Sequence, residues 1–337
     1  SLRPSNLIWV MPAKEGEHKV LKKKYLAVIT AALIGISVSG CATTSEAPAL
    51  TVAVHDSIVI SDEQLAEFKK ETGITVTLVK AGDAGAMTNK LILTKDQPIA
   101  DMFYGIDNTF IGAAALGGIL GDYKAIDFGD VCFNYDKKWF ATHEQAAPET
   151  IDDLTKEEFR GLTVVENPTT SSTALAFLVA TVGKYGEAKW QSYWEALKAN
   201  DVRIDSGWEE AYNVNFSGSA GKGNYPIVLS YSSSPAFEEN TVSIDDGCFR
   251  QTEYAGLLRG GAQAEGAKKF IKFLLSDNFQ KTIPDSMYMY PVNTNVGLPE
   301  AWATKAPAAT NAIAVDSKLI NENRSSWLKT WDAIFKN

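Results

Sequence analysis

Residues 50–106 read LTVAVHDSIVISDEQLAEFKKETGITVTLVKAGDAGAMTNKLILTKDQPIADMFYGI, and this stretch decides the fold. Segments in which apolar residues alternate as in a strand are followed by segments in which they recur with helical spacing. A capping box from Ser61 to Gln64 and a helix stop at Gly73 bound the first helix. The pattern predicts strands at 50–54, 75–80 and 100–106, separated by helices at 62–72 and 84–94. A βαβαβ order requires a parallel sheet with right-handed crossovers, so the predicted fold class is α/β.

The rest of the chain predicts a second α/β unit that begins near Gly129. Its strands are expected around Cys132 and at 162–166 and 227–231, with helices at 173–185 and 188–199. Another strand is expected at 252–258, after which helices are expected at 264–275 and 319–335. A chain of 337 residues approaches the upper size of a single core, which favours two lobes with a ligand cleft between them. We expect lobe 1 to comprise residues 50–128 plus about 258–337, and lobe 2 to comprise residues 129–257.

The N-terminal part carries the pattern of an export signal. Lys22 to Lys24 precede the apolar run 25–38, which is too short for a membrane-spanning helix, and small residues precede Cys41. This order resembles a bacterial lipobox and predicts an N-terminal extension with a lipoprotein signal peptide over residues 1–41. Acylated Cys41 would anchor the protein at the outer face of the membrane. An ordinary secretory peptide cut elsewhere is the alternative. In both cases we expect an extracytoplasmic protein, either lipid-anchored or periplasmic, and residues 42–49 are predicted to form a tether.

Composition and motifs exclude several classes of protein. The chain is 45% hydrophobic, which predicts a folded protein, and its net charge of −9 argues against nucleic acid as a partner. It has no GxGxxG after a strand, no GxxxxGK[ST] and no GxSxG, and none of its three histidines has a partner at metal-ligand spacing. We therefore expect no cofactor, no metal and no catalytic residue.

Cys132 and Cys248 are the cysteines that follow the predicted anchor. In an exported protein such a pair predicts a disulfide, and both residues lie in strand-like segments that could be neighbours. Two buried thiols or one reactive thiolate are the alternatives.

Acidic and aromatic side chains recur in the loops after predicted strands. The candidates are Asp56, Asp83, Asp107, residues 170–173, Trp208, Tyr212, residues 231–234, Tyr288 and Tyr290. Ring faces and carboxylates attract a cation, while hydroxyls and free N–H groups at a helix start suit an oxygen-rich tail. The pattern favours a cationic heterocycle with a polar end. Helix capping by the acids, and core packing of Trp208 or Tyr212, are the alternatives.

Six tracts follow one another in the predicted cleft loops. They are His55-Asp56-Ser57, Gly105-Ile106-Asp107-Asn108, Asn167-Pro168-Thr169-Thr170-Ser171-Ser172, Gly207-Trp208-Glu209-Glu210-Ala211-Tyr212, Leu229-Ser230-Tyr231-Ser232-Ser233-Ser234-Pro235-Ala236 and Met289-Tyr290-Pro291-Val292. In order and spacing they resemble the thiamine-binding proteins of bacterial ABC importers. The resemblance implies a two-lobed, type II periplasmic-binding-protein-like fold, thiamine or its phosphate esters as ligand, and an ABC permease as partner. We expect the receptor to be a monomer.

The resemblance also assigns ligand contacts. They fall on Asp83, the amide of Ala84, Ser171, Ser172, Trp208, Tyr231, Ser232, Ser233 and Ser234, with Asp56 and Tyr288 as further candidates. Trp208 and Tyr231 would stack on the rings, Asp83 would meet the cationic or amino end, and the serines would hold the polar arm. His55 stands where the family often has Tyr, which predicts a smaller aromatic cage.

Other functions fit parts of the pattern. A thiaminase-like enzyme, which resembles these receptors in fold, would use Cys132 as nucleophile and would need a free thiol of low pKa. A receptor for another cationic solute, such as a polyamine, would share the acidic and aromatic loops. A ferric-iron receptor predicts adjacent tyrosine ligands, and the sequence has no Tyr-Tyr pair. We favour a receptor that performs no chemistry.

Overall fold

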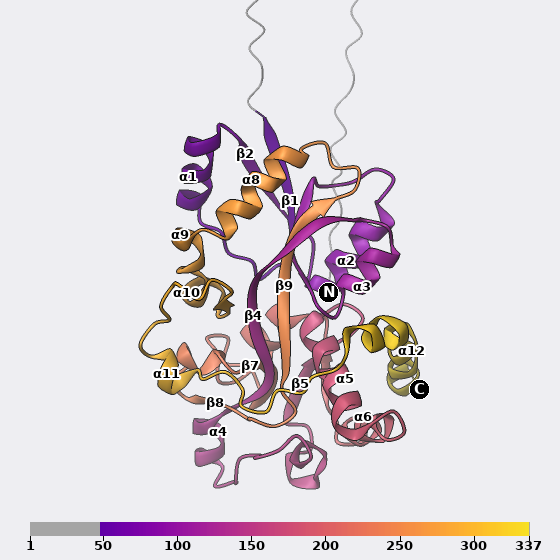
Figure 1. Cartoon of the computed structure of the whole chain (residues 1–337). Coiled ribbons are helices and arrows are strands. Elements are labelled where there is room, and N and C mark those ends of the chain that lie inside the picture. The colour runs from indigo at the N-terminus through magenta and orange to yellow at the C-terminus, as the bar shows by residue number, and fades with distance from the viewer. Residues whose placement is uncertain (1–47, 337) are drawn as a thin grey trace, which may run out of the picture. The chain divides into compact units, whose positions relative to one another are not determined.

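The computed structural model describes residues 48–336, which form a ten-stranded mixed sheet with helices packed on its faces (Figure 1). The predicted α/β class is confirmed. The predicted signal peptide, the Cys41 anchor and most of the 42–49 tether lie outside the described residues. Across residues 48–336, no helix combines the length and apolar character needed to cross a membrane.

The opening βαβαβ unit folds as the sequence predicts. Strand β1 (Ala49–Val54) pairs in parallel with β2 (Thr75–Lys80) on one side and with β3 (Met102–Asp107) on the other. Helices α1 (Asp62–Thr72) and α2 (Ala84–Leu93) form the crossovers. The parallel order places the loops after all three strands at the same edge of the sheet.

Local capping and burial on both faces explain why this unit forms. Ser61 Oγ accepts from Gln64 N at 3.2 Å, Gln64 Oε1 accepts from Ser61 N at 2.8 Å, and Gly73 ends α1 with φ 72°. Ala53 of β1 packs into the core that contains α2, whereas Val54 packs into the core that contains α1. The sheet is therefore covered on both faces, as parallel sheets are.

Two long antiparallel strands join the two halves of the sheet (Figure 1). They are β4 (Leu120–Asp136) and β9 (Phe249–Leu258), at the centre of the order β2-β1-β3-β9-β4-β7-β5-β6. The sequence predicted β4 only near Cys132 and β9 only from Thr252, so both strands are longer than predicted. The predicted lobe boundaries at 128/129 and 257/258 fall inside these strands.

The second half of the sheet is again parallel. Strand β5 (Thr163–Glu166) pairs in parallel with β6 (Arg203–Asp205) and β7 (Ile227–Tyr231), and β7 pairs antiparallel with β4. Helix α5 (Ser172–Tyr185) is buried along most of its length, and α6 (Trp190–Ala199) packs beside it. Strand β6 was not predicted, whereas the other elements match the predicted strands and helices within three residues.

The remaining helices and strands complete the described part of the chain. They are α3 (Ile111–Leu116), α4 (Lys137–Thr142), η1 (Asp153–Thr155), η2 (Glu157–Phe159), α7 (Trp208–Glu210), η3 (Ala211–Asn215), η4 (Ser234–Ala236), β8 (Thr241–Ser243), α8 (Ala264–Leu274), α9 (Asp277–Gln280), α10 (Ile283–Met287), β10 (Tyr290–Pro291), α11 (Trp302–Lys305) and α12 (Ser317–Lys336). Helices α8 and α12 were predicted, whereas the short helices between them were not.

Cys132 and Cys248 form the predicted disulfide. Pairing of Val131 with Phe249 in the adjacent strands β4 and β9 sets the two cysteines side by side, with their Cα atoms 4.5 Å apart. Neither cysteine is a free thiol, so the alternatives of buried thiols and of a reactive thiolate do not hold in this structure.

Candidate functional site

A cleft lies where loops from both halves of the sheet meet. It is lined by His55, Ser57, Ile58, Asp83, Ser172, Thr173, Trp208, Tyr231, Glu253, Met287, Tyr288 and Met289. Most of these residues follow the carboxyl end of a strand or begin a helix, which is where open α/β sheets bind ligands. The free space in this conformation is about 40 Å³, enough for only a few water molecules. A ligand with two rings can therefore enter only when the walls move apart.

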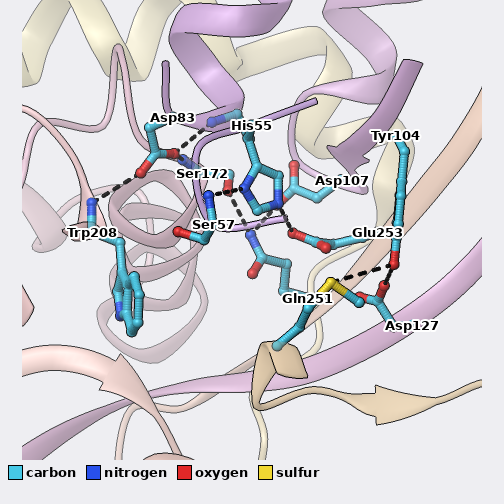
Figure 2. A network of polar contacts seen from close by, with 12 residues as sticks. His55, Ser57, Asp83, Tyr104, Asp107, Asp127, Ser172, Trp208, Gln251 and Glu253 are labelled. Atoms are coloured by element: carbon cyan, nitrogen blue, oxygen red, sulfur yellow. Dashed lines mark hydrogen bonds and ion pairs between the residues drawn. The ribbon is translucent and has the colours of Figure 1, made fainter. Parts of the chain in front are cut away.

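Asp83 connects three backbone N–H groups in the cleft (Figure 2). It caps α2 by accepting from Ala84 N at 2.7 Å, and it also accepts from Ser172 N at 3.2 Å and from Trp208 N at 2.9 Å. Burial raises the pKa of Asp83, although these donors and His55 stabilise the carboxylate. The capping interpretation is thus confirmed, and the same carboxylate holds loops from the two halves of the sheet together.

Trp208 presents an indole ring to the cleft. The ring stacks on Tyr212, with centroids 4.8 Å apart and planes inclined by 12°, and its Nε1 donates to Ser230 Oγ at 3.0 Å. Tyr212 is buried and is the member of the pair that packs in the core. The stack and the hydrogen bond hold the indole in one orientation without a ligand.

Tyr231 lies at the end of β7 and is held by a chain of hydrogen bonds. Its hydroxyl donates to Gln251 Oε1 at 2.6 Å and lies 3.1 Å from Thr173 Oγ1. Gln251 Nε2 donates in turn to Ser172 Oγ at 2.9 Å. Burial, with the charge of Glu253, raises the pKa of Tyr231 well above its usual value, so this phenol stays neutral.

Asp83, Ser172, Trp208, Tyr231 and Tyr288 are the predicted site residues that line the cleft. Ala84 and Asp56 lie beside it: the Ala84 N–H is taken by Asp83, and Asp56 Oδ1 accepts from Gly82 N at 3.1 Å. Ser171 is buried just ahead of α5, and its hydroxyl has no partner among the described residues.

Ser232, Ser233 and Ser234 form a turn after β7 and do not line the cleft in this conformation. Ser232 lines a separate cavity, Ser233 Oγ donates to the carbonyl of Tyr288, and Ser234 Oγ bonds a serine hydroxyl of β7 at 2.9 Å. The Tyr288 ring stacks on Phe237 with centroids 3.9 Å apart. The ligand role of these serines stays a prediction.

His55 and Glu253 were not among the predicted contacts, yet both line the cleft. His55 Nε2 lies 2.9 Å from Glu253 Oε1, and His55 Nδ1 accepts from Ser57 N at 3.2 Å (Figure 2). The alternation along β9 could have revealed the carboxylate, because Glu253 shares a face with the buried Phe249 and Gln251.

Further acidic side chains lie behind the part of the cleft that His55 and Glu253 line. Asp127 of β4 is fully buried, accepts from the Tyr104 hydroxyl, and has a second oxygen without a partner among the described residues. Burial and the charge of Glu253 raise the pKa of Asp127 well above its usual value, and burial raises the pKa of Asp107 to about 6. No lysine or arginine is among the described residues that line the cleft. Residues 48–336 contain no cluster of three or more His, Cys, Asp or Glu suited to a metal.

Comparison with known proteins identifies the family. The family model described as bacterial extracellular solute-binding protein matches residues 99–334. The thiamine-binding periplasmic proteins of Salmonella typhimurium and Brucella suis are 27% and 26% identical to the chain, covering 84% and 91% of it and 92% and 98% of their own lengths. A solved structure described as a periplasmic thiamin binding protein has a TM-score of 0.75 at 25% identity, covering 85% of this chain and 96% of its own. The resemblance seen in the six tracts is confirmed, and the chain belongs to the bacterial extracellular solute-binding protein family.

Proposed function

We propose that this protein is an extracytoplasmic receptor that binds thiamine, or a phosphate ester of thiamine, and delivers it to an ABC import permease without catalysis of its own. The observation that carries the proposal is that Asp83, ahead of α2, Trp208, at the start of α7, and Tyr231, at the end of β7, line one cleft. An indole, a phenol and a carboxylate suit a flat ligand that bears a thiazolium cation. The relatives named as thiamine-binding proteins support the same ligand.

Within the cleft, we assign Trp208 and Tyr231 to ring stacking and Asp83 to the cationic or amino end. The start of α5, with the unpartnered Ser171 hydroxyl and with Ser172, suits the hydroxyethyl arm or its phosphate. The proposed contacts of the ligand-bound state also include Ala84, Asp56, Tyr288, Ser232, Ser233 and Ser234.

We propose that the two lobes hinge where β4 and β9 cross between them. Lobe 1 (50–128 plus about 258–337) and lobe 2 (129–257) would separate when the bonds from Asp83 to Ser172 and Trp208 break. Acylated Cys41 and the 42–49 tether would hold a monomeric receptor at the outer face of the membrane, beside its permease.

Calorimetry tests the proposed ligand. Titration of the purified receptor with thiamine, thiamine monophosphate and spermidine should show binding of thiamine or its ester at least about tenfold tighter than binding of the polyamine, a difference of about 1.4 kcal/mol. Absence of binding by both thiamine and its ester, or tighter binding of spermidine, would overturn the proposal.

Asp83→Asn should weaken a cationic ligand more than a neutral one. Asparagine keeps the helix cap but removes a charge, and a charge pair at contact distance is worth about 1 kcal/mol even at the dielectric constant of water. We expect about fivefold weaker thiamine binding, and a change below about twofold for an isostere whose thiophene ring replaces the thiazolium.

Both affinities would be measured by calorimetry. Asp136→Asn is the matched control, because Asp136 caps α4 and is not a lining residue of the cleft. Equal losses for the two ligands would contradict a charge role for Asp83.

A thiaminase-like reaction would require Cys132 as a free nucleophile in the cleft. Its sulfur is bonded to Cys248, and no cysteine is among the described lining residues. This geometry supports the receptor role. Incubation with thiamine and an added amine should leave thiamine intact.

A further inference from the structure

We propose that Glu253 is a second carboxylate, besides Asp83, that meets the positive charge of the ligand, and that His55 positions Glu253 and balances its charge until the ligand arrives. This inference rests on the proposed function, because it assumes a cation in the cleft. Glu253 is in this view a further residue that selects for charge, and His55 is a positioning residue.

The two carboxylates of the lining differ in the hydrogen bonds that they already accept. Asp83 accepts from three backbone N–H groups (Figure 2). Glu253 accepts from one side-chain nitrogen, His55 Nε2, and it also faces the carboxyl group of Asp127, whereas a carboxylate offers about four lone-pair sites. Glu253 therefore keeps more capacity for a ligand. Its side chain is only 5% exposed, so its charge is poorly solvated and its attraction for a cation is correspondingly strong.

His55 is held in place by packing as well as by hydrogen bonds. The ring lies against Gly105 of β3, which has φ 107° and where a Cβ would approach His55 Cδ2 to 2.2 Å. Ser57 N donates to Nδ1, so the hydrogen-bond network assigns the Nε2 proton to the bond with Glu253. In this neutral form His55 still orients Glu253. Protonation at Nδ1 adds a charge but removes the acceptor of the Ser57 N–H.

The charged and titratable groups around the pair of His55 and Glu253 come from several elements. They are Glu253 of β9, Asp83 ahead of α2, Asp56 after β1, Asp127 of β4, Tyr104 of β3, Tyr231 of β7 and Tyr288 after α10. All of them are acids or phenols, so His55 itself is the group of this set that can carry a positive charge. Burial disfavours the imidazolium, but Glu253, Asp83 and Asp56 outweigh burial and raise the pKa of His55 above its usual value.

A cation that binds beside Glu253 makes the charge on His55 unfavourable. Binding should therefore release the His55 proton, and by linkage thiamine affinity should rise with pH until His55 is neutral. Ionisation of Asp83 and of Asp107 also raises the affinity for a cation as the pH rises, at lower pH than His55. The pKa of Asp107 is about 6, and that of Asp83 is raised by burial. A variant without the imidazole is needed to separate these contributions.

The test measures affinities for thiamine and for its neutral thiophene isostere from about pH 5.5 to about pH 8, across the titration range of histidine. The isostere shares the aminopyrimidine and so corrects for titration of the ligand. In the wild type, the ratio of the two affinities should rise about fivefold or more over this range. His55→Gln should reduce the rise to about twofold or less, whereas His143→Gln, at an exposed histidine outside the lining, should retain it.

Glu253→Gln should weaken thiamine at least about tenfold at the upper pH and weaken the isostere less than about threefold. Glu253→Asp keeps the charge and should keep a preference for thiamine, and unfolding midpoints establish that each variant is folded. Equal losses of both ligands in Glu253→Gln, or an unchanged pH profile in His55→Gln, would overturn this inference. Failure of the wild type to bind thiamine at any pH would instead overturn the proposed function.

Discussion

Trp208→Ala is expected to lower thiamine affinity by at least tenfold while the protein stays folded. The indole offers a flat surface of fixed orientation, because it stacks on Tyr212 and donates to Ser230. Stacking of a heterocycle on an aromatic side chain is worth about 1–3 kcal/mol, and a cation over the ring adds about 0.5–2 kcal/mol. Losing both should weaken binding by one to three orders of magnitude, which calorimetry would measure.

Two further variants make this test specific. Trp208→Phe keeps a smaller ring face and should recover part of the affinity. Trp139→Ala removes another partly exposed tryptophan, which stacks on His143 rather than lining the cleft, and should leave affinity unchanged. Trp208→Ala binding thiamine within twofold of wild type would show that the indole is not part of the ligand site.

The fold could be predicted wherever local signals agree with tertiary structure. The opening unit has a capping box at Ser61 and a helix stop at Gly73, and its strands appear at the predicted positions. The first part of β4 could not be predicted, because residues 122–124 are exposed and become strand through the pairing of this segment with β9. Such pairing joins segments far apart in sequence, so local propensity does not report it.

The candidate site could be predicted only in part, because the burial of a strand face and the direction of a side chain also depend on tertiary structure. Asp83 precedes α2, Trp208 begins α7 and Tyr231 ends β7, so each stands where a helix or strand begins or ends, and all three line the cleft. Glu253 is inside a strand and resembles a residue of a solvated face until the burial of that face is known. In the turn 232–234, three identical residues give no indication of which hydroxyl faces a ligand. The direction in which each serine side chain points depends on the backbone geometry of the turn, which the residue type does not encode.

Loss of the disulfide is expected to lower the free energy of unfolding by about 3–5 kcal/mol on the chain-entropy model. The bridge joins cysteines 116 residues apart and links β4 to β9, the two strands that connect the halves of the sheet. Without it the unfolded chain gains conformational freedom, whereas the ladder between β4 and β9 remains in the folded state. Denaturant unfolding of the oxidised wild type and of the Cys132→Ala/Cys248→Ala variant would measure the difference.

The same variant separates the effect of the disulfide on protein stability from any catalytic role of Cys132. Because neither cysteine lines the cleft, thiamine affinity below the unfolding range should stay within about threefold of wild type, a change of less than 1 kcal/mol. Unfolded, unreduced wild type that starts at residue 42 should show no free thiol, since Cys132 and Cys248 are bonded to each other. Equal unfolding energies would show that the bridge does not restrict the unfolded chain. A titratable thiol, together with consumption of thiamine that the double variant lacks, would make Cys132 a nucleophile and the protein an enzyme.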